Sequence, residues 1–141
     1  MTQPPETEID AVVHRHIEAL NDQDREAFID CFDSESTPHG MDFDDFVEVE
    51  FSFFDAFPDL QYPLHEVVVD GDLVAFRWTF RGTHTGTGGP DPLGSVDPTH
   101  EEVEVTGINI ARVENGKIVE YTAEWDVLEL LETLGIIEYA L

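Results

Sequence analysis

The chain has 141 residues, 41% of them hydrophobic, which is enough for the core of one domain spanning residues 1–141. Its 32 acidic residues against 6 basic ones give a formal net charge of −26. Nucleic acids and anionic membrane surfaces are excluded as partners, because binding either requires a basic surface. The single cysteine excludes an internal disulfide, and no apolar run could span a bilayer. The first residues lack a signal-peptide pattern, so we expect a cytoplasmic protein.

The acidic charge does not predict disorder. Aromatic residues make up 11% of the chain, and regular apolar spacing indicates a folded core. Concentrated salt shortens the Debye length to about 3 Å at 1 M and thereby screens repulsion between carboxylates. The composition, with Lys117 as its only lysine, therefore predicts a protein adapted to the salt-rich cytosol of a halophile.

Apolar residues at helical spacing predict three helices in the first part of the chain. The first covers about residues 6–21, and a short second helix contains Ala27 to Phe32. The third follows a polar link and contains Phe43 to Phe57, where Pro58 ends it.

From Tyr62 onward the apolar period changes to two, which predicts four antiparallel strands. The first has a bulge near His65, and tight turns follow the first and third strands at Gly71 and Gly116. A last short helix ends at Gly135. This order predicts an α+β domain in which helices cover the open side of a curved sheet, forming a cone with a ligand pocket at its mouth.

The sequence contains no recognisable metal, phosphate or nucleophile motif. His14 and His16 lie about 200° apart around a helix, so they cannot bind one ion together. The glycine-rich segment 82–94 has no lysine and no helix after it, which favours a flexible lid or insertion over a phosphate-binding loop. Cys31 lies on the apolar side of its helix, which favours a structural thiol. We expect neither a metal nor a cofactor.

Carboxylates near the end of the last strand are the candidates for acid–base chemistry. Thr122, Glu124 and Asp126 share one face of that strand. If this face lines the cone, its acids lie against aromatic walls, where burial raises the pKa of a carboxyl group. Asp126 also has a structural interpretation, because Glu129 three residues later completes a helix N-cap pattern. The two roles are compatible.

Two further polar residues occur where hydrophobic residues are expected. His84 continues the apolar face of the second strand, so it is either a buried core histidine or a pocket residue. Asn109 shares the face of Val103 and Val105, and a buried amide needs a partner, either a side chain or a ligand.

Several segments resemble one known family in the order in which they occur: Ala56–Leu60, Gly71–Ala75, Arg77–Thr79, Gly82–Gly86, Val105–Ile108 and Glu124–Asp126 followed by Leu130–Gly135. The chain resembles the SnoaL-like polyketide or ester cyclases of the nuclear transport factor 2-like superfamily. The resemblance implies a cone-shaped α+β barrel, usually dimeric, with a hydrophobic cavity. It also implies ring closure by intramolecular aldol chemistry without metal or cofactor.

The resemblance also assigns roles to individual residues. Asp126 matches the family's acid–base residue, and His84 matches a pocket histidine that orients a carbonyl. Asn109 stands where many relatives carry aspartate and would donate a hydrogen bond to an enolate. The chain departs from the family in a shorter segment 32–39 and a longer loop 85–100. The expected pocket residues are Trp78, Phe53, Trp125, Glu124 and Thr122.

Two hypotheses follow. The first is a cofactor-free cyclase or isomerase that acts on a small apolar carbonyl compound, with Asp126 projecting into a dry cavity. The second is a non-catalytic ligand-binding or dimerisation module of the same fold, in which Asp126 only caps a helix. We expect a homodimer in either case. If Asp126 instead faces bulk solvent, or if side chains fill the cavity, the enzyme hypothesis fails and only a salt-adapted scaffold remains.

Overall fold

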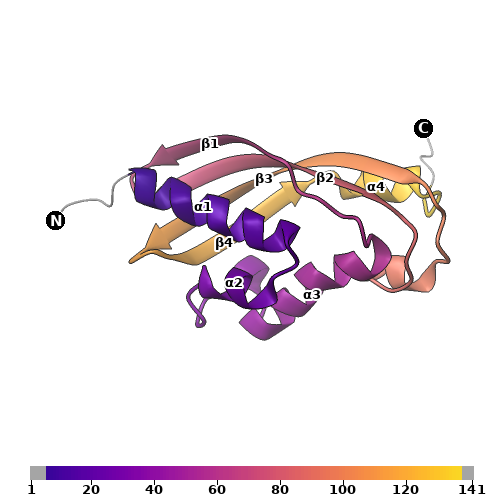
Figure 1. The fold of residues 1–141 in the computed structure, drawn as a ribbon, viewed down its shortest axis with the longest axis horizontal. Helices are drawn as coiled ribbons and strands as arrows, with labels where there is room; N and C mark the ends of the chain where they lie inside the picture. The colour runs from indigo at the N-terminus through magenta and orange to yellow at the C-terminus, as the bar shows by residue number, and fades with distance from the viewer. Residues whose placement is uncertain (1–5, 138–141) are drawn as a thin grey trace.

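The computed structural model describes residues 6–137 and has the expected α+β element order (Figure 1). The elements are α1 (Glu6–Asn21), α2 (Arg25–Asp30), α3 (Phe43–Ala56), β1 (Leu64–Asp70), β2 (Leu73–Thr83), β3 (Glu102–Glu114), β4 (Lys117–Trp125) and α4 (Val127–Thr133). Two short 3-10 turns, η1 (Pro38–Gly40) and η2 (Leu93–Ser95), lie in segments that the sequence analysis treats as loops.

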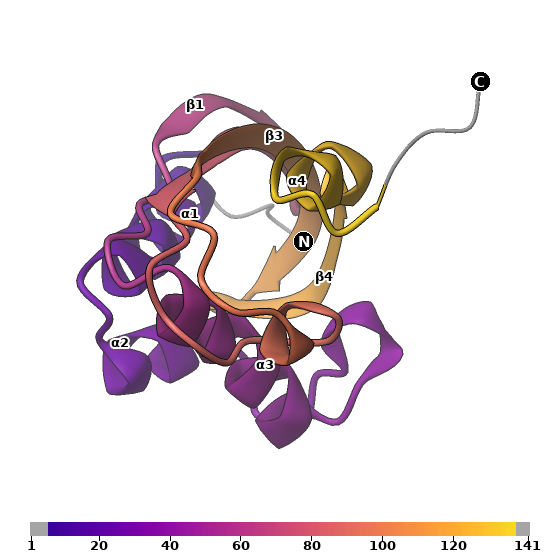
Figure 2. The same ribbon diagram turned by 90° about the vertical axis from the view of Figure 1, so that its right-hand side faces the viewer.

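The four strands form one antiparallel sheet in the order β1-β2-β3-β4. The predicted bulge in β1 is confirmed by a register shift between Leu64 and Val67. A second irregularity between Arg112 and Val113 was not predicted. Bulges increase local twist, and seen end-on the sheet curves around an interior that α1, α2 and α3 close from the other side (Figure 2).

The turn between β3 and β4 confirms the expected hairpin. Asn115 and Gly116 both have positive φ, 52° and 76°, as a type I′ turn requires. The short connection fixes the register of β4 against β3, which pairs Ala123 with Asn109. This pairing decides which side chains of β4 face the interior.

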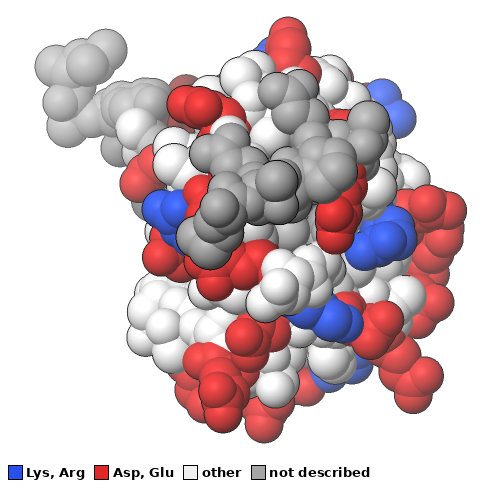
Figure 3. All heavy atoms as spheres, turned by 90° about the vertical axis from the view of Figure 1, so that its left-hand side faces the viewer, with Lys and Arg blue, Asp and Glu red and all other residues white. Residues whose placement is uncertain are grey.

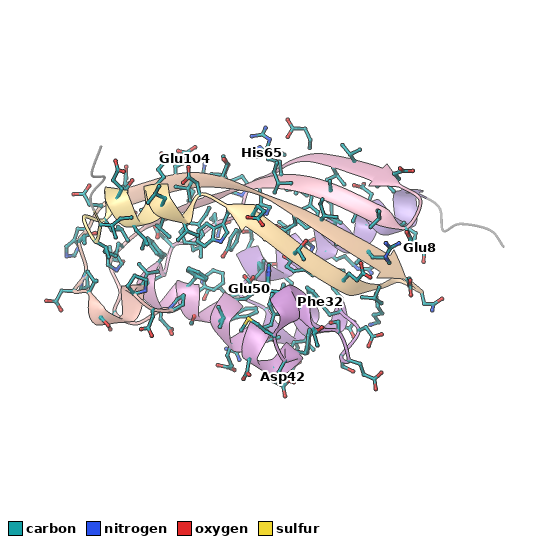
Figure 4. All side chains as sticks on the ribbon, turned by 180° about the vertical axis from the view of Figure 1, so that it is seen from behind. Glu8, Phe32, Asp42, Glu50, His65 and Glu104 are labelled. Atoms are coloured by element: carbon teal, nitrogen blue, oxygen red, sulfur yellow. The ribbon has the colours of Figure 1, made fainter. Side chains whose placement is uncertain are left out.

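The concave side of the sheet forms the core. Val74, Phe76, Trp78 and Phe80 of β2 are all buried, as the alternation predicts. The opposite face is open: the exposed fractions of Val68, Ile108 and Ile110 are 64%, 50% and 53%. Figure 4 shows His65 and Glu104 on this outer side.

The segment from residue 85 to residue 100 packs against α3 and the end of β2. Of the two interpretations of the glycine-rich segment 82–94, a lid or an insertion, this packing favours the insertion. The Gly86 amide donates to the Ala56 carbonyl at 3.0 Å, and the His100 amide donates to the His84 carbonyl at 2.9 Å. A Cβ atom at Gly86 would lie 1.9 Å from the Asp55 carbonyl oxygen, so glycine permits this close approach. Leu93 is 2% exposed and anchors the middle of the segment.

On the face that Figure 3 shows, carboxylates are numerous and few basic groups lie between them. Among the residues that the structure describes, Arg77 forms a bidentate pair with Glu66, and Arg112 pairs with Asp72 and Glu120. No helix in the described part of the chain is both long and apolar enough to cross a membrane.

Candidate functional site

A cavity lies between α3 and the concave face of the sheet. The cavity has a volume of about 70 Å³. All the empty space around it, including the open solvent at its mouth, amounts to about 500 Å³. An apolar wall with a few convergent polar groups is typical of small-molecule sites. Most of the lining is aromatic or aliphatic, and its polar groups are one histidine, one glutamate, one asparagine and two tyrosine hydroxyls. The lining residues are Ile17, Leu20, His39, Glu50, Phe53, Tyr62, Trp78, Phe80, Asn109, Tyr121, Ala123 and Trp125.

The aromatic wall depends on a glycine in β3. The rings of Trp78 and Trp125 lie 6.0 Å apart between centroids, and Phe53 meets Trp125 edge-on at 5.6 Å. A Cβ atom at Gly107 would lie 2.5 Å from the Trp78 ring and 2.7 Å from Cβ of Trp125. Both tryptophans therefore occupy space that any other residue at position 107 would fill.

Glu50 is the carboxylate of this cavity. It comes from α3, and its half-buried side chain lies in the space between that helix and the sheet (Figure 4). Burial raises the pKa of Glu50 to about 7, because the surrounding protein disfavours the charged form. A carboxyl group with this pKa exchanges protons readily near neutral pH, which suits general acid–base catalysis.

Two tyrosines lie close to this carboxylate. Burial, and then the negative charge of Glu50, raise the pKa of Tyr62 and of Tyr121 well above the usual value. Both hydroxyls therefore stay protonated at neutral pH. They are neutral hydrogen-bonding groups in the wall of the cavity.

Asn109 provides an amide on the sheet side of the cavity. It is 1% exposed, and its Oδ1 accepts a hydrogen bond from Trp78 Nε1 at 2.5 Å. Because the indole N–H can only donate, this contact identifies the oxygen of the amide and leaves its NH₂ group for other partners. The neighbouring Asn109 amide lowers the pKa of Tyr121, in opposition to the larger effects of burial and the charge of Glu50.

His39 lies at the exposed edge of the cavity. Its backbone is left-handed, with φ of 56°, and its ring meets Tyr121 edge-on at 5.8 Å. Burial lowers the pKa of His39, and the nearby Glu124 carboxylate opposes this effect. In the part of the chain that the structure describes, no three His, Cys, Asp or Glu side chains are grouped so that they could hold a metal ion.

Comparison with known proteins decides the family. Residues 9–134 match the family model described as SnoaL-like polyketide cyclase. The chain belongs to this SnoaL-like family. Its fold is that of the SnoaL-like proteins. No protein of curated function matches it significantly.

Solved structures include similar SnoaL-like folds. AclR of Streptomyces galilaeus, described as a candidate hydroxylase, is 26% identical with a TM-score of 0.83; the match covers 97% of this chain and 87% of AclR. IdmH of Streptomyces antibioticus, a candidate polyketide cyclase, is 28% identical with a TM-score of 0.78 over 90% of this chain and 98% of IdmH. A candidate SnoaL-like cyclase from Jannaschia sp. CCS1 is 20% identical with a TM-score of 0.79, covering 98% and 99%, and shows the fold alone.

The structure brings only some of the expected site residues of this SnoaL-like chain together. Phe53, Trp78, Trp125 and Asn109 line the cavity, which also contains Glu50. The expectation that Thr122 and Glu124 line it is wrong, since both are exposed on the outer face. Side chains alternate along a strand, so the inward position of Tyr121, Ala123 and Trp125 turns their even-numbered neighbours outward.

Asp126 lies outside the cavity. Its side chain is exposed, and its Oδ1 accepts a hydrogen bond from the Glu129 amide at 3.0 Å, which caps α4. The capping interpretation is confirmed. The hypothesis that Asp126 projects into a dry hollow is wrong, because the chain turns into α4 directly after β4.

His84 is buried, but it does not line the cavity. Its Nδ1 accepts a hydrogen bond from the Thr99 amide at 3.1 Å, and its ring lies 5.3 Å from that of Phe57. Its Nε2 has no hydrogen-bond partner among the residues described. The contacts of His84 hold the segment 85–100 against the end of β2. The role of His84 is therefore structural.

Sequence reasoning missed Glu50, although the sequence contains a signal for it. Residues 43, 46, 47, 50 and 54 lie on one side of a helix at spacings of three and four, and all except residue 50 are phenylalanine or valine. An acidic residue inside an apolar stripe is the kind of exception that marks a pocket. His16 is the same kind of exception on α1, among Ile9, Val12, Val13 and Leu20.

Proposed function

We propose that the chain is a cofactor-free enzyme of the cyclase or isomerase type, in which Glu50 moves a proton on a small apolar carbonyl compound. The observation that carries the proposal is a half-buried carboxyl group that lines an aromatic cavity together with the Asn109 amide. Burial there raises the pKa of Glu50 to about 7. Glu50 takes the role that the sequence analysis gave to Asp126. Asn109 keeps its expected role as a hydrogen-bond donor, and His84 has none in this reaction.

The reaction begins with the ionised form of Glu50. The carboxylate takes a proton from the carbon beside the carbonyl, and the electron pair of the broken C–H bond moves onto the carbonyl oxygen. An N–H of Asn109 stabilises the enolate oxygen by a hydrogen bond. In an isomerase, protonated Glu50 returns the proton at another position. In a cyclase, the enolate carbon first attacks a second carbonyl, and Glu50 protonates the new alkoxide.

The width of the cavity limits the substrate. Only about 70 Å³ is open to the centre of a water molecule, and the walls are flat aromatic rings. A planar conjugated compound fits such a space better than a branched one does. A bulky polycyclic substrate would require the rings of Phe53 and Trp125 to move apart.

The likeness to AclR favours a second candidate function, hydroxylation. A hydroxylase would share the first step, proton removal by Glu50. The carbanion would then add dioxygen and a proton to form a hydroperoxide, whose reduction to the alcohol and water takes two electrons and two protons from an external reductant. Oxygen uptake measured beside the proton-transfer assay distinguishes the two functions. Uptake that requires Glu50 identifies a hydroxylase.

The test uses benzoylacetone, a flat aromatic β-diketone whose enol form absorbs in the ultraviolet. We expect the protein to accelerate its keto–enol interconversion and Glu50→Gln to reduce this acceleration by roughly 10²-fold or more. Asp45→Asn is the matched control, since Asp45 is exposed on the same helix. Binding of benzoylacetone with no acceleration would instead identify a non-catalytic module, and an unchanged rate in Glu50→Gln would refute the role of Glu50.

We also propose that the protein is a homodimer that associates through the outer face of the sheet, in a salt-rich cytosol. Val68, Ala75, Ile110 and Thr122 are paired in one row across the four strands, and the first and third are exposed apolar residues. The high net charge makes association dependent on salt. Light scattering in molar KCl should give a dimer for the natural chain and a monomer for Ile110→Glu. A monomer for both contradicts the proposal.

A further inference from the structure

The indole of Trp78 has a polar contact inside the aromatic wall of the cavity. Its Nε1 donates a hydrogen bond to Oδ1 of Asn109 at 2.5 Å. Both side chains are buried, and both line the cavity. A buried indole N–H needs an acceptor, and an amide oxygen is the group that supplies it here. The contact therefore constrains the amide as well as the ring.

The neighbours of Trp78 hold its ring in the place from which this bond forms. Trp78 is paired with Gly107 across the ladder between β2 and β3, and the absence of a side chain at Gly107 lets the ring lie directly over the strand. The rings of Tyr62 and Trp125 lie 5.7 and 6.0 Å from that of Trp78 between centroids. Residues 107 and 109 share one face of β3, so a ring over Gly107 lies beside the next inward side chain, Asn109.

The contact selects one of the two orientations of the Asn109 amide. With Oδ1 toward Trp78, the indole N–H has an acceptor. In the flipped orientation two donors, the indole N–H and the amide NH₂ group, would face each other. The indole N–H would then be buried without a partner, which makes the flipped orientation rarer by roughly tenfold or more. The amide therefore keeps its oxygen toward Trp78.

The NH₂ group of Asn109 is left for a ligand. Among the described residues, the structure has no hydrogen bond from Nδ2 to a protein acceptor. The side chains paired with Asn109 on the same face are Phe76 of β2 and Ala123 of β4, and neither has a polar group. An NH₂ group has two hydrogens, so a bond from one of them to the nearby Tyr121 hydroxyl would still leave the other. A donor in this position bonds to water or to a ligand.

We propose that Trp78 determines which ligands the cavity accepts, by turning the amide of Asn109 so that this residue offers a hydrogen-bond donor and not an acceptor. The ligands selected are flat compounds that present a carbonyl or enolate oxygen to β3. A compound that presents an N–H group there finds no acceptor at Asn109. Trp78 is a positioning residue, because it acts on the ligand through Asn109. The inference rests on the cavity of the proposed function and deepens it, but it concerns binding and is testable without a reaction.

The first experiment compares acetophenone with α-methylstyrene, a compound of the same shape in which a methylene group replaces the carbonyl oxygen. NMR titrations in molar KCl give the dissociation constant of each compound for the natural chain and for Trp78→Phe. Looser packing weakens both compounds alike, so the ratio of the two constants reports the hydrogen bond to the oxygen. We expect this ratio to shift against acetophenone by roughly fivefold in Trp78→Phe, as for the loss of one hydrogen bond. An unchanged ratio would overturn the proposal, and so would a natural chain that binds neither compound.

Trp125→Phe is the matched control, because Trp125 lines the same cavity while the bond to Asn109 comes from Trp78. It should weaken both compounds and leave their ratio unchanged, and an equal shift of the ratio in both tryptophan variants contradicts the proposal. Asn109→Leu should shift the ratio as Trp78→Phe does. Adding Trp78→Phe to Asn109→Leu should shift it no further, since Trp78 acts through Asn109. A further shift in the double variant would refute this route.

A measurement on the natural protein covers the case in which Trp78→Phe does not fold. In NMR spectra of ¹⁵N-labelled protein, acetophenone should move one of the two side-chain N–H protons of Asn109 downfield, because that proton gains a carbonyl acceptor. The ring of α-methylstyrene occupies the same place without an acceptor and controls for the effect of the aromatic ring on the spectrum. Equal shifts with both compounds would overturn the proposal.

The two proposals fail in different ways. If Glu50→Gln keeps full activity with benzoylacetone while the ligand ratio shifts in Trp78→Phe, the proposed function is wrong and the role of Trp78 stands. If Glu50→Gln is inactive and the ratio does not shift, the proposed function stands and the role of Trp78 is refuted.

Discussion

Replacing Glu50 by glutamine should make the protein more stable at pH 8 while removing its activity. The pKa of this carboxyl group rises from 4.5 to about 7 on folding, because the cavity disfavours its charge. A pKa difference of one corresponds to about 1.4 kcal/mol, so keeping Glu50 ionised in the folded protein costs about 3 kcal/mol. Glutamine has a similar shape without the charge and avoids this cost.

The cost has a specific dependence on pH. Between pH 4.5 and 7 the folded state binds more protons at Glu50 than the unfolded state does, so the free energy of unfolding falls as the pH rises through this window. Below pH 4.5 the carboxyl group is neutral in both states and costs nothing. Above pH 7 the full cost is present. The stability advantage of Glu50→Gln should therefore grow from near zero at pH 4 to about 3 kcal/mol at pH 8.

Urea unfolding at pH 4, 6 and 8 in constant molar KCl measures this difference. Many other carboxylates titrate over the same range, so the comparison uses the difference between the natural chain and the variant at each pH. Asp45→Asn provides the matched control, and its difference should change little with pH because Asp45 is exposed. An advantage for Glu50→Gln that is independent of pH would refute a raised pKa at Glu50.

Four further predictions follow from the site and its surroundings. The rate with benzoylacetone should rise from pH 6 to pH 8 with a midpoint near 7, since Glu50 must be ionised to accept a proton; a flat profile argues against Glu50 as the base. Asp126→Ala should lower the free energy of unfolding in urea by about 0.5–2 kcal/mol and retain full activity, because Asp126 only caps α4; a large loss of kcat would restore its catalytic role. Gly107→Ala should displace Trp78 and Trp125, cost about 1–3 kcal/mol and change the tryptophan fluorescence, whereas an unaltered spectrum contradicts the close approach. Raising KCl from 0.1 M to 2 M should raise the urea midpoint, because salt screens the net charge of −26; a midpoint that falls disproves adaptation to salt.

The sequence predicted the fold well because its periodicities are strong. Helical spacing located α1 and α3 to within a residue or two, and the Asn115-Gly116 turn set the boundary between β3 and β4. Alternation in β2 identified Phe76 and Trp78 as inward-facing. These signals are local, and the hydrophobic effect enforces them along each element.

The candidate site was predicted less well, because it depends on contacts between distant elements. The alternation of Tyr121 and Trp125 already favours the odd-numbered face of β4 as the inner one. The carboxylates of this strand lie on its even-numbered face, so a prediction that started from the acids placed the wrong face inside. Glu50 is one of 32 acidic residues, and only its place in the apolar stripe of α3 distinguishes it. Its pKa depends on the sheet packed opposite, which local sequence does not specify.

The alternation along β3 also protects the chemistry of the cavity. Asn109 faces inward between Ile108 and Ile110, which face outward. A slip of this strand by one residue would place an isoleucine at the cavity wall and the amide in solvent. The ladder between β2 and β3 resists such a slip through eleven consecutive residue pairs, from Leu73 to Thr83. The same backbone pairing that assembles the sheet therefore guarantees which of its two surfaces is able to recognise an oxygen atom.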